Sequence, residues 1–270
     1  MEEQILWVTR LVNQLLGGPA LALLDALHIQ PENRAYPIPN HIAMELVVLL
    51  LSIIFFLWFK RRISVENPGG TQQCMESLLT NPLGVGALDL LKGIVGPHSE
   101  QYLPMIGAVG IFILIANLIS LVPGFMSPTA QVSVPLGCAV AVFLYYNFCG
   151  FRAHGPWGYA RHFIGPVWWL FLIMVPIELL SHFARLLSLT VRLWVNMFVS
   201  ELLYFIFLGL TLGLYGFSKS LNPVLQVTGI FPLAVPVIFM GLHVFVAVLQ
   251  AFVFTILPVV YLGGAVGEEH

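Results

Sequence analysis

Charged side chains are scarce in this chain. They make up 9% of its 270 residues, whereas an ordinary soluble domain has about 25%. The strict alternation of apolar and polar residues that marks membrane β-barrels is also missing. Hydrophobic residues instead form long continuous runs and account for 59% of the chain. The composition therefore excludes an ordinary soluble domain and predicts an all-α polytopic membrane protein.

Cysteines and catalytic motifs are equally sparse. Cys74, Cys138 and Cys149 lie far apart in sequence, which argues against a disulfide or a metal site. His154 and His162 are eight residues apart in a Gly/Pro-rich loop, which is weak evidence for a metal site. H-E-x-x-H, G-x-S-x-G and the phosphate loop G-x-x-x-x-G-K-[ST] are absent, so an intramembrane enzyme has no motif to support it. We predict no cofactor, no metal and no nucleic-acid partner.

Five apolar blocks are long enough to cross a bilayer, which needs roughly 20 mostly apolar residues. The predicted spans are about 42–59, 103–122, 132–149, 166–215 and 224–262. Between the first two, segments 75–79 and 83–95 predict interfacial helices. Residues 5–27, interrupted at Gly17–Pro19, predict an interfacial helix or a loosely docked arm. We divide the chain into an arm, 1–41, and a single transmembrane ion-translocating domain, 42–270.

Basic residues predict the orientation, because they mark the cytoplasmic side. Lys60–Arg62 close the first span, and Arg152 and Arg161 follow the third. The loop 127–131 carries no basic residue. We expect an extracytoplasmic N-terminus and a cytoplasmic C-terminus, with Lys219 as the one exception to the pattern.

The fourth block is too long for an upright span. Ile177–Gly213 contains no proline and would form a helix about 55 Å long, against a hydrocarbon core of about 30 Å. Such a helix must tilt, bend or extend beyond the core. The last block is also long, and prolines at 232, 236 and 258 can kink it. We predict that the two form a long tilted helical hairpin.

Arg192 lies in the middle of this apolar region. A cation at bilayer depth costs about 2.5–3.5 kcal/mol on insertion scales, and Arg cannot avoid that cost by releasing its proton. Arg192 is therefore a functional-site candidate, with a structural ion pair as the alternative. At 100° per residue, a sector of about 80° contains Arg192 together with other polar residues. These are Glu178, Ser181, Arg185, Ser188 and Asn196.

Glu201 falls on the opposite face, nearer the outer end. A second stripe, on the last block, contains His243, Gln250 and Tyr261, which share one helical face. Each polar residue also has a purely structural interpretation. The serines could bond to backbone carbonyls, and the amides of Asn196 and Gln250 could join helices. His243 could be buried with its hydrogen bonds satisfied, Arg185 could extend its charge to the interface, and Glu178 could be solvated. The two stripes together are more specific evidence for a functional site than any single residue in them.

These residues carry a family resemblance. Ser188-Leu189-x-x-Arg192-Leu193-x-x-Asn196-Met197, followed by Glu201, resembles the signature of subunit a of F-type ATP synthases. Pro176-Ile177-Glu178 with Ser181 and Arg185 is similar to the segment before that signature. The run from His243 through Leu249-Gln250-Ala251-Phe252 to Tyr261 resembles the last helix of the family. Trp194, Val195 and Ser200 depart from the family pattern at positions that affect packing. The resemblance covers about residues 40–270.

The resemblance implies a stationary proton-channel subunit that faces a rotating ring of c subunits. We expect it in a bacterial inner membrane, with an organelle membrane as the alternative. Its other partners would be the b subunits of the peripheral stalk, the rest of the F1Fo complex and the lipid bilayer. ATP chemistry would belong to other subunits, so the chain is not itself an enzyme. The implied outer proton path contains Asn196, Glu201, His243 and Gln250. The inner path contains Glu178, Ser181 and Tyr261, with Arg192 as the separator and Arg185 and Ser188 as auxiliaries.

An alternative function is a stand-alone secondary transporter with Arg192 as its substrate anchor. Five spans, no inverted repeat and no paired broken half-helices count against it. Dependence on a c-ring partner would distinguish the two. Either H⁺ or Na⁺ is compatible with the resemblance, because the ion-binding carboxyl group belongs to the ring.

Overall fold

A computed structural model describes residues 5–28, 30, 33–64, 68–79, 86–96, 99–122, 125–164, 171–221 and 231–266, and within these ranges the regular secondary structure is helical. Among the described residues, five helices are long and apolar enough to cross a membrane. They are Asn40–Arg62, Ser99–Leu121, Ser133–Gly155, Leu172–Gly213 and Pro236–Val266. The all-α polytopic class is thereby confirmed. The predicted span starts at 166 and 224 and the terminal residues 268–270 lie outside the described ranges.

The first three spans follow the predicted apolar runs. α2 (Asn40–Arg62) ends on three basic residues, and α5 (Leu103–Leu118) continues into the short η2 (Ile119–Leu121). α6 (Ser133–Ile164) passes the predicted end at 149 and is interrupted at Gly155, where φ is +71°. Only glycine adopts this backbone conformation without strain. The third span is therefore longer than the apolar run alone indicates.

The two longest helices are α7 (Phe171–Leu221) and α9 (Phe231–Val266). The 42-residue segment Leu172–Gly213 would measure about 63 Å, about twice the thickness of the hydrocarbon core. Pro176 and Pro258 lie inside these helices without ending them. The tilt of α7 and α9 in a membrane stays a prediction.

Short helices occupy the regions predicted to be interfacial. α3 (Gly70–Leu79) and α4 (Ala87–Ile94) have 10 and 8 residues. Neither reaches the roughly 20 residues that a membrane crossing needs. Besides η2, the described chain contains the 3-10 helices η1 (Ser99–Tyr102) and η3 (Pro128–Ala130).

The chain forms two compact units, and α7 and α9 supply residues to both. The first unit contains Met1–Ile53, Leu114–Gln131 and Val195–Val248. Its α1 (Trp7–Ala26) continues through the Gly17–Pro19 interruption. Thr9 Oγ1 of α1 donates to Asn40 Oδ1 at 2.8 Å, and Asn13 exchanges two hydrogen bonds with the Ile38 backbone. The N-terminal helix is therefore held to the start of α2 by buried polar contacts.

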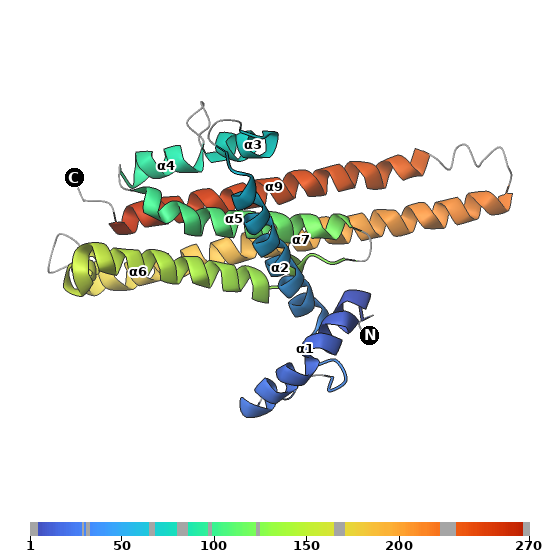
Figure 1. Cartoon of the computed structure of the whole chain (residues 1–270), viewed down its shortest axis with the longest axis horizontal. Helices are drawn as coiled ribbons and strands as arrows, with labels where there is room; N and C mark the ends of the chain where they lie inside the picture. Colours follow the sequence, from blue (N-terminus) through green and yellow to red (C-terminus); the bar gives the residue numbers. More distant parts are fainter. Residues whose placement is uncertain are drawn as a thin grey trace. The chain divides into compact units, whose positions relative to one another are not determined.

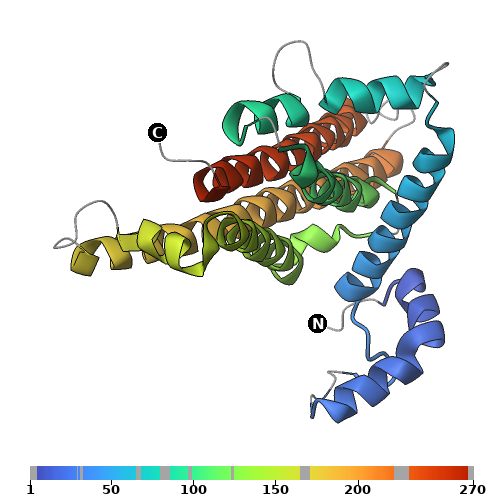
Figure 2. The same cartoon turned by 60° about the vertical axis from the view of Figure 1, so that its left-hand side comes forward.

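In the same unit, the second half of α7 lies beside the first half of α9 (Figures 1 and 2). The rings of Phe207 and Phe239 stack there with centroids 4.2 Å apart. Aromatic pairs of this kind add to the apolar packing of two helices.

The second unit contains Ile54–Ile113, Val132–Trp194 and Leu249–His270. Two glycines of this unit permit close packing of neighbouring segments. A Cβ at Gly110 would lie 2.5 Å from Thr255 Oγ1, and a Cβ at Gly263 would collide with Ile94.

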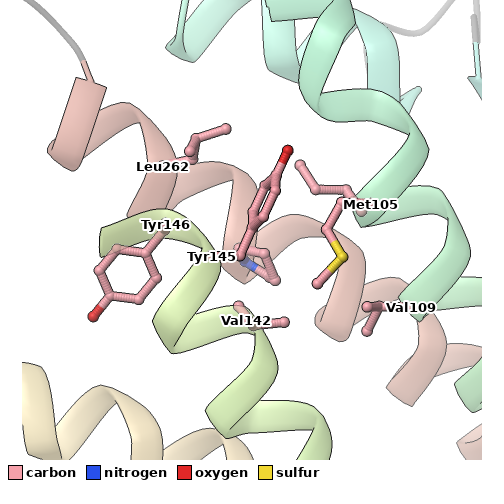
Figure 3. Close-up of a pocket in the computed structure, with 8 residues that line it drawn as sticks. Met105, Val109, Val142, Tyr145, Tyr146 and Leu262 are labelled. Atoms are coloured by element: carbon pink, nitrogen blue, oxygen red, sulfur yellow. The ribbon is translucent and has the colours of Figure 1, made fainter. Parts of the chain in front are cut away.

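A small pocket in this unit is lined by side chains from α5, α6 and α9 (Figure 3). One cluster of buried hydrophobic residues in this unit consists of Leu91, Ile106, Val142, Tyr146, Cys149, Val259, Leu262 and Ala265.

Candidate functional site

The first unit buries a group of polar side chains that we call the His243 cluster. His243 is 4% exposed, and its two ring nitrogens have different partners. Nδ1 lies 3.0 Å from Ser200 Oγ of α7, whereas Nε2 lies 3.0 Å from Ser120 Oγ and 3.2 Å from the Asn117 carbonyl oxygen. The imidazole thus joins α9 to α7 and to the end of α5. The cluster consists of Asn117, Ser120, Ser127, Thr129, Ser200, Glu201 and His243.

The segment after α5 completes this cluster. Thr129 Oγ1 donates to Asn117 Oδ1 at 2.6 Å and lies 2.6 Å from Ser127 Oγ. The Glu201 carboxyl group is within hydrogen-bonding reach of the Ser127 backbone N–H. Within the described chain, Glu201 Oε1 and Asn117 Nδ2 are buried without a hydrogen-bond partner. Such atoms are rare because they are costly, which favours a functional role for this group over simple packing.

The second unit contains another polar group, the His182 cluster, made of Tyr146, Glu178, His182, Arg185 and Tyr261. His182 is 5% exposed. Its Nε2 lies 3.5 Å from Glu178 Oε1, one helical turn earlier on α7, and its Nδ1 lies 2.8 Å from the Tyr146 hydroxyl of α6. The imidazole therefore lies between a carboxyl group and a phenol.

Aromatic contacts extend this cluster to α9. The Tyr261 ring centroid lies 5.9 Å from that of Tyr146, and the Arg185 guanidinium lies over the Tyr261 ring at 5.4 Å. A cation within about 6 Å of an aromatic face is attracted by its quadrupole. Three helices thus contribute acid, base, phenol and guanidinium groups within one unit.

Arg192 lies on an exposed face of α7. Its neighbours Leu189 and Leu193 are 1% and 0% exposed and pack inward, whereas Val191 is 48% exposed. Arg192 Nη2 lies 3.5 Å from Ser188 Oγ, a weak contact at the limit of hydrogen bonding. Among the described residues, no carboxylate lies within ion-pair distance of Arg192. The guanidinium thus lacks an acidic partner in the described chain.

The other predicted site residues occupy varied environments. Asn196 and Ser188 are exposed, and Ser181 is half-buried. Gln250, in the second unit, is 1% exposed, and its Oε1 has no hydrogen-bond partner among the described residues. The channel roles assigned to these residues from the sequence stay predictions.

Several residues of both clusters were missed in the sequence. His182 is four residues after Glu178, a spacing that brings side chains together on a helix, but it lies outside the sector that contains Arg192. Tyr146 has no such signal, because its partner is on another helix. Ser120, Ser127 and Thr129 lie in the sequence between α5 and α6, and their spacing forms no periodic pattern.

Comparison with known proteins agrees with the motifs. The sequence model of the ATP synthase A chain family matches residues 42–263. The chain is 38% identical over 265 residues to ATP synthase subunit a of Koribacter versatilis, covering 98% of each protein. It is 40% identical over 259 residues to ATP synthase subunit a of Solibacter usitatus, covering 96% of this chain and 99% of that protein. Because the family model matches most of the chain and both relatives match nearly its whole length, the chain belongs to the ATP synthase subunit a family.

Proposed function

We propose that this chain is the stationary proton-channel subunit of an F-type ATP synthase membrane motor. The observation that carries the proposal is the exposed Arg192, which has no carboxylate partner in the described chain. A cation at this depth needs a compensating charge. A carboxylate on a rotating ring of c subunits would supply one from outside the chain.

The outer half-channel of this proposal contains the His243 cluster, together with Asn196 and Gln250. His243 contacts Ser120 and Ser200, and Glu201 adds a carboxyl group with one unpartnered oxygen. Such groups can accept and release protons through short hydrogen bonds. A proton entering here would reach a ring carboxylate and neutralise it before it rotates into lipid, because a neutral carboxyl is far cheaper to bury.

The inner half-channel contains Glu178, Ser181 and Tyr261. Glu178 has a side chain that is 34% exposed and contacts His182, so it can exchange protons with both the surface and the interior of the unit. Arg185 lies over Tyr261 and would keep positive charge near this path. A ring carboxyl arriving after nearly a full rotation would release its proton here.

Arg192 separates the two paths in this mechanism. Its permanent charge stabilises the deprotonated ring carboxylate and so favours departure of the proton. The same charge repels a proton that would otherwise leak directly between the paths. One charge crossing 100 mV releases about 2.3 kcal/mol, and a leak would dissipate that energy without rotation.

The proposal includes the surroundings of the subunit. The exposed face of α7 would meet the c ring, the b subunits would hold the chain against rotation, and lipid would cover the remaining apolar surface. We assign it to a bacterial inner membrane with an extracytoplasmic N-terminus and a cytoplasmic C-terminus. ATP would be made or hydrolysed on other subunits.

The test compares Arg192→Ala with wild type in inverted vesicles that contain the whole complex. We expect ATP-driven proton pumping, followed by a pH-sensitive dye, to disappear while the assembled amount of the subunit stays normal. Arg152→Ala removes another exposed arginine and is the matched control. Retained pumping in Arg192→Ala would refute the proposal. Transport by the chain without a c ring would favour the secondary-transporter alternative.

A further inference from the structure

His182 is the most enclosed member of its cluster that can change charge near neutral pH. Its side chain is 7% exposed, against 34% for Glu178. The Tyr146 ring stacks on the imidazole at 5.8 Å and 20°, and Phe143 meets it edge-on at 6.3 Å. This packing fixes the plane of the imidazole. Both nitrogens therefore keep their directions, one toward the carboxyl group and the other toward the phenol.

The two partners permit a reversible proton transfer. When Nδ1 carries the hydrogen and donates it to the Tyr146 oxygen, the Nε2 lone pair faces Glu178. A protonated Glu178 can then give its proton to Nε2, which leaves a carboxylate beside an imidazolium. The net charge of the pair is unchanged, and the reverse step returns the proton to Glu178. When Tyr146 instead donates to Nδ1, Nε2 already holds the hydrogen and the transfer is blocked.

We propose that His182 is a second proton-carrying residue of the inner path, with Tyr146 as the positioning residue that fixes the direction of its Nδ1. Glu178 and His182 would then act as one pair, whose protonation depends on both groups. This inference rests on the proposed function, because it extends the inner half-channel from α7 to α6. A purely structural His182 would only tie these helices together.

The charged and titratable groups around His182 come from three helices. Glu178 is its neighbour on α7, and Tyr146 faces it from α6. Tyr261 of α9 packs against Tyr146, and Arg185 lies over Tyr261. Within the described residues, Glu178 supplies a carboxylate oxygen within ion-pair distance of the imidazole, whereas Arg185 contacts Tyr261.

The experiment measures passive proton flux through the membrane sector in vesicles while only the pH on the cytoplasmic face is varied. Imidazole ordinarily titrates between about pH 5 and 8. His182→Gln keeps hydrogen-bonding atoms but cannot gain charge in that range. Tyr146→Phe removes only the hydroxyl. Tyr145→Phe is the matched control, because Tyr145 occupies the adjacent position on α6 with its ring directed away from that of Tyr146 (Figure 3).

We expect wild type and Tyr145→Phe to share one pH profile, Tyr146→Phe to shift it, and His182→Gln to lose its inflection between about pH 5 and 8. An assembled His182→Gln with the wild-type profile would overturn the inference. If His182→Gln does not assemble, Tyr146→Phe decides, and a profile equal to that of Tyr145→Phe overturns it. The proposed function fails separately, if Arg192→Ala still pumps.

Discussion

The Thr129 hydroxyl contacts two other members of the His243 cluster. Its removal should therefore lower the stability of the first unit. Thr129 is 0% exposed, donates to Asn117 Oδ1 at 2.6 Å and lies 2.6 Å from Ser127 Oγ. Thr129→Val keeps the shape of the side chain but removes the donor to the Asn117 side-chain oxygen, whereas Ser127 keeps its hydrogen bond to the Ala116 carbonyl at 3.0 Å. Polar bonds in membrane proteins contribute about 0.6 kcal/mol on average and at most about 1.7. Losing the bond to Asn117 should cost about 0.6–1.7 kcal/mol, or a factor of about 3 to 16 in the unfolding equilibrium.

The matched control is Thr190→Val. Thr190 is also buried, at 3% exposure, but its hydroxyl donates to the Leu186 carbonyl of its own helix. We would measure the temperature at which the detergent-solubilised complex loses this subunit. Thr129→Val should lower that temperature clearly more than Thr190→Val does. Equal temperatures for the two variants would refute the argument that Thr129 joins separate segments through buried hydrogen bonds.

Three further predictions concern the channel and its packing. Arg192→Lys should abolish ATP-driven pumping although it keeps a positive charge, because the compact ammonium lacks the planar, always-protonated fork; normal proton-driven ATP synthesis by that variant would contradict the role. Glu201→Gln and His243→Ala should each change the dependence of proton uptake on outer pH, and if neither changes it, the outer path runs elsewhere. Gly110→Val should reduce the amount of assembled subunit on immunoblots, since its Cβ would collide with an α9 hydroxyl, whereas Gly107→Val, with open space around its Cβ position, should not.

The helical class and the spans followed from the sequence. Backbone groups in lipid must be bonded within their own segment, so an apolar run of sufficient length becomes a helix whatever it packs against. For that reason α2 and α5 begin and end close to the predicted limits. α6 did not, because residues 150–154, which include Arg152, continue the helix beyond the apolar run as far as the kink at Gly155.

The family and the intramembrane cation, Arg192, could also be predicted from the sequence. Local spacing places Glu178, Ser188 and Arg192 near one helical face, and that depends only on the period of the helix. The signature around Arg192 was therefore visible without any tertiary information. Its lack of a carboxylate partner in the described chain was not, because that depends on every other segment of the protein.

Contacts between segments were decided by the tertiary structure. Tyr146 and His182 are joined by a hydrogen bond of 2.8 Å, and His243 reaches Asn117 and Ser120 from a distant helix. Helical periodicity predicts the face of the helix on which a side chain lies. The partner that it contacts depends on the register and the crossing angle of two packed helices. The sequence by itself thus determined the membrane helices, the polar stripe and the family, and only the tertiary structure decided which proton-carrying groups lie within reach of one another.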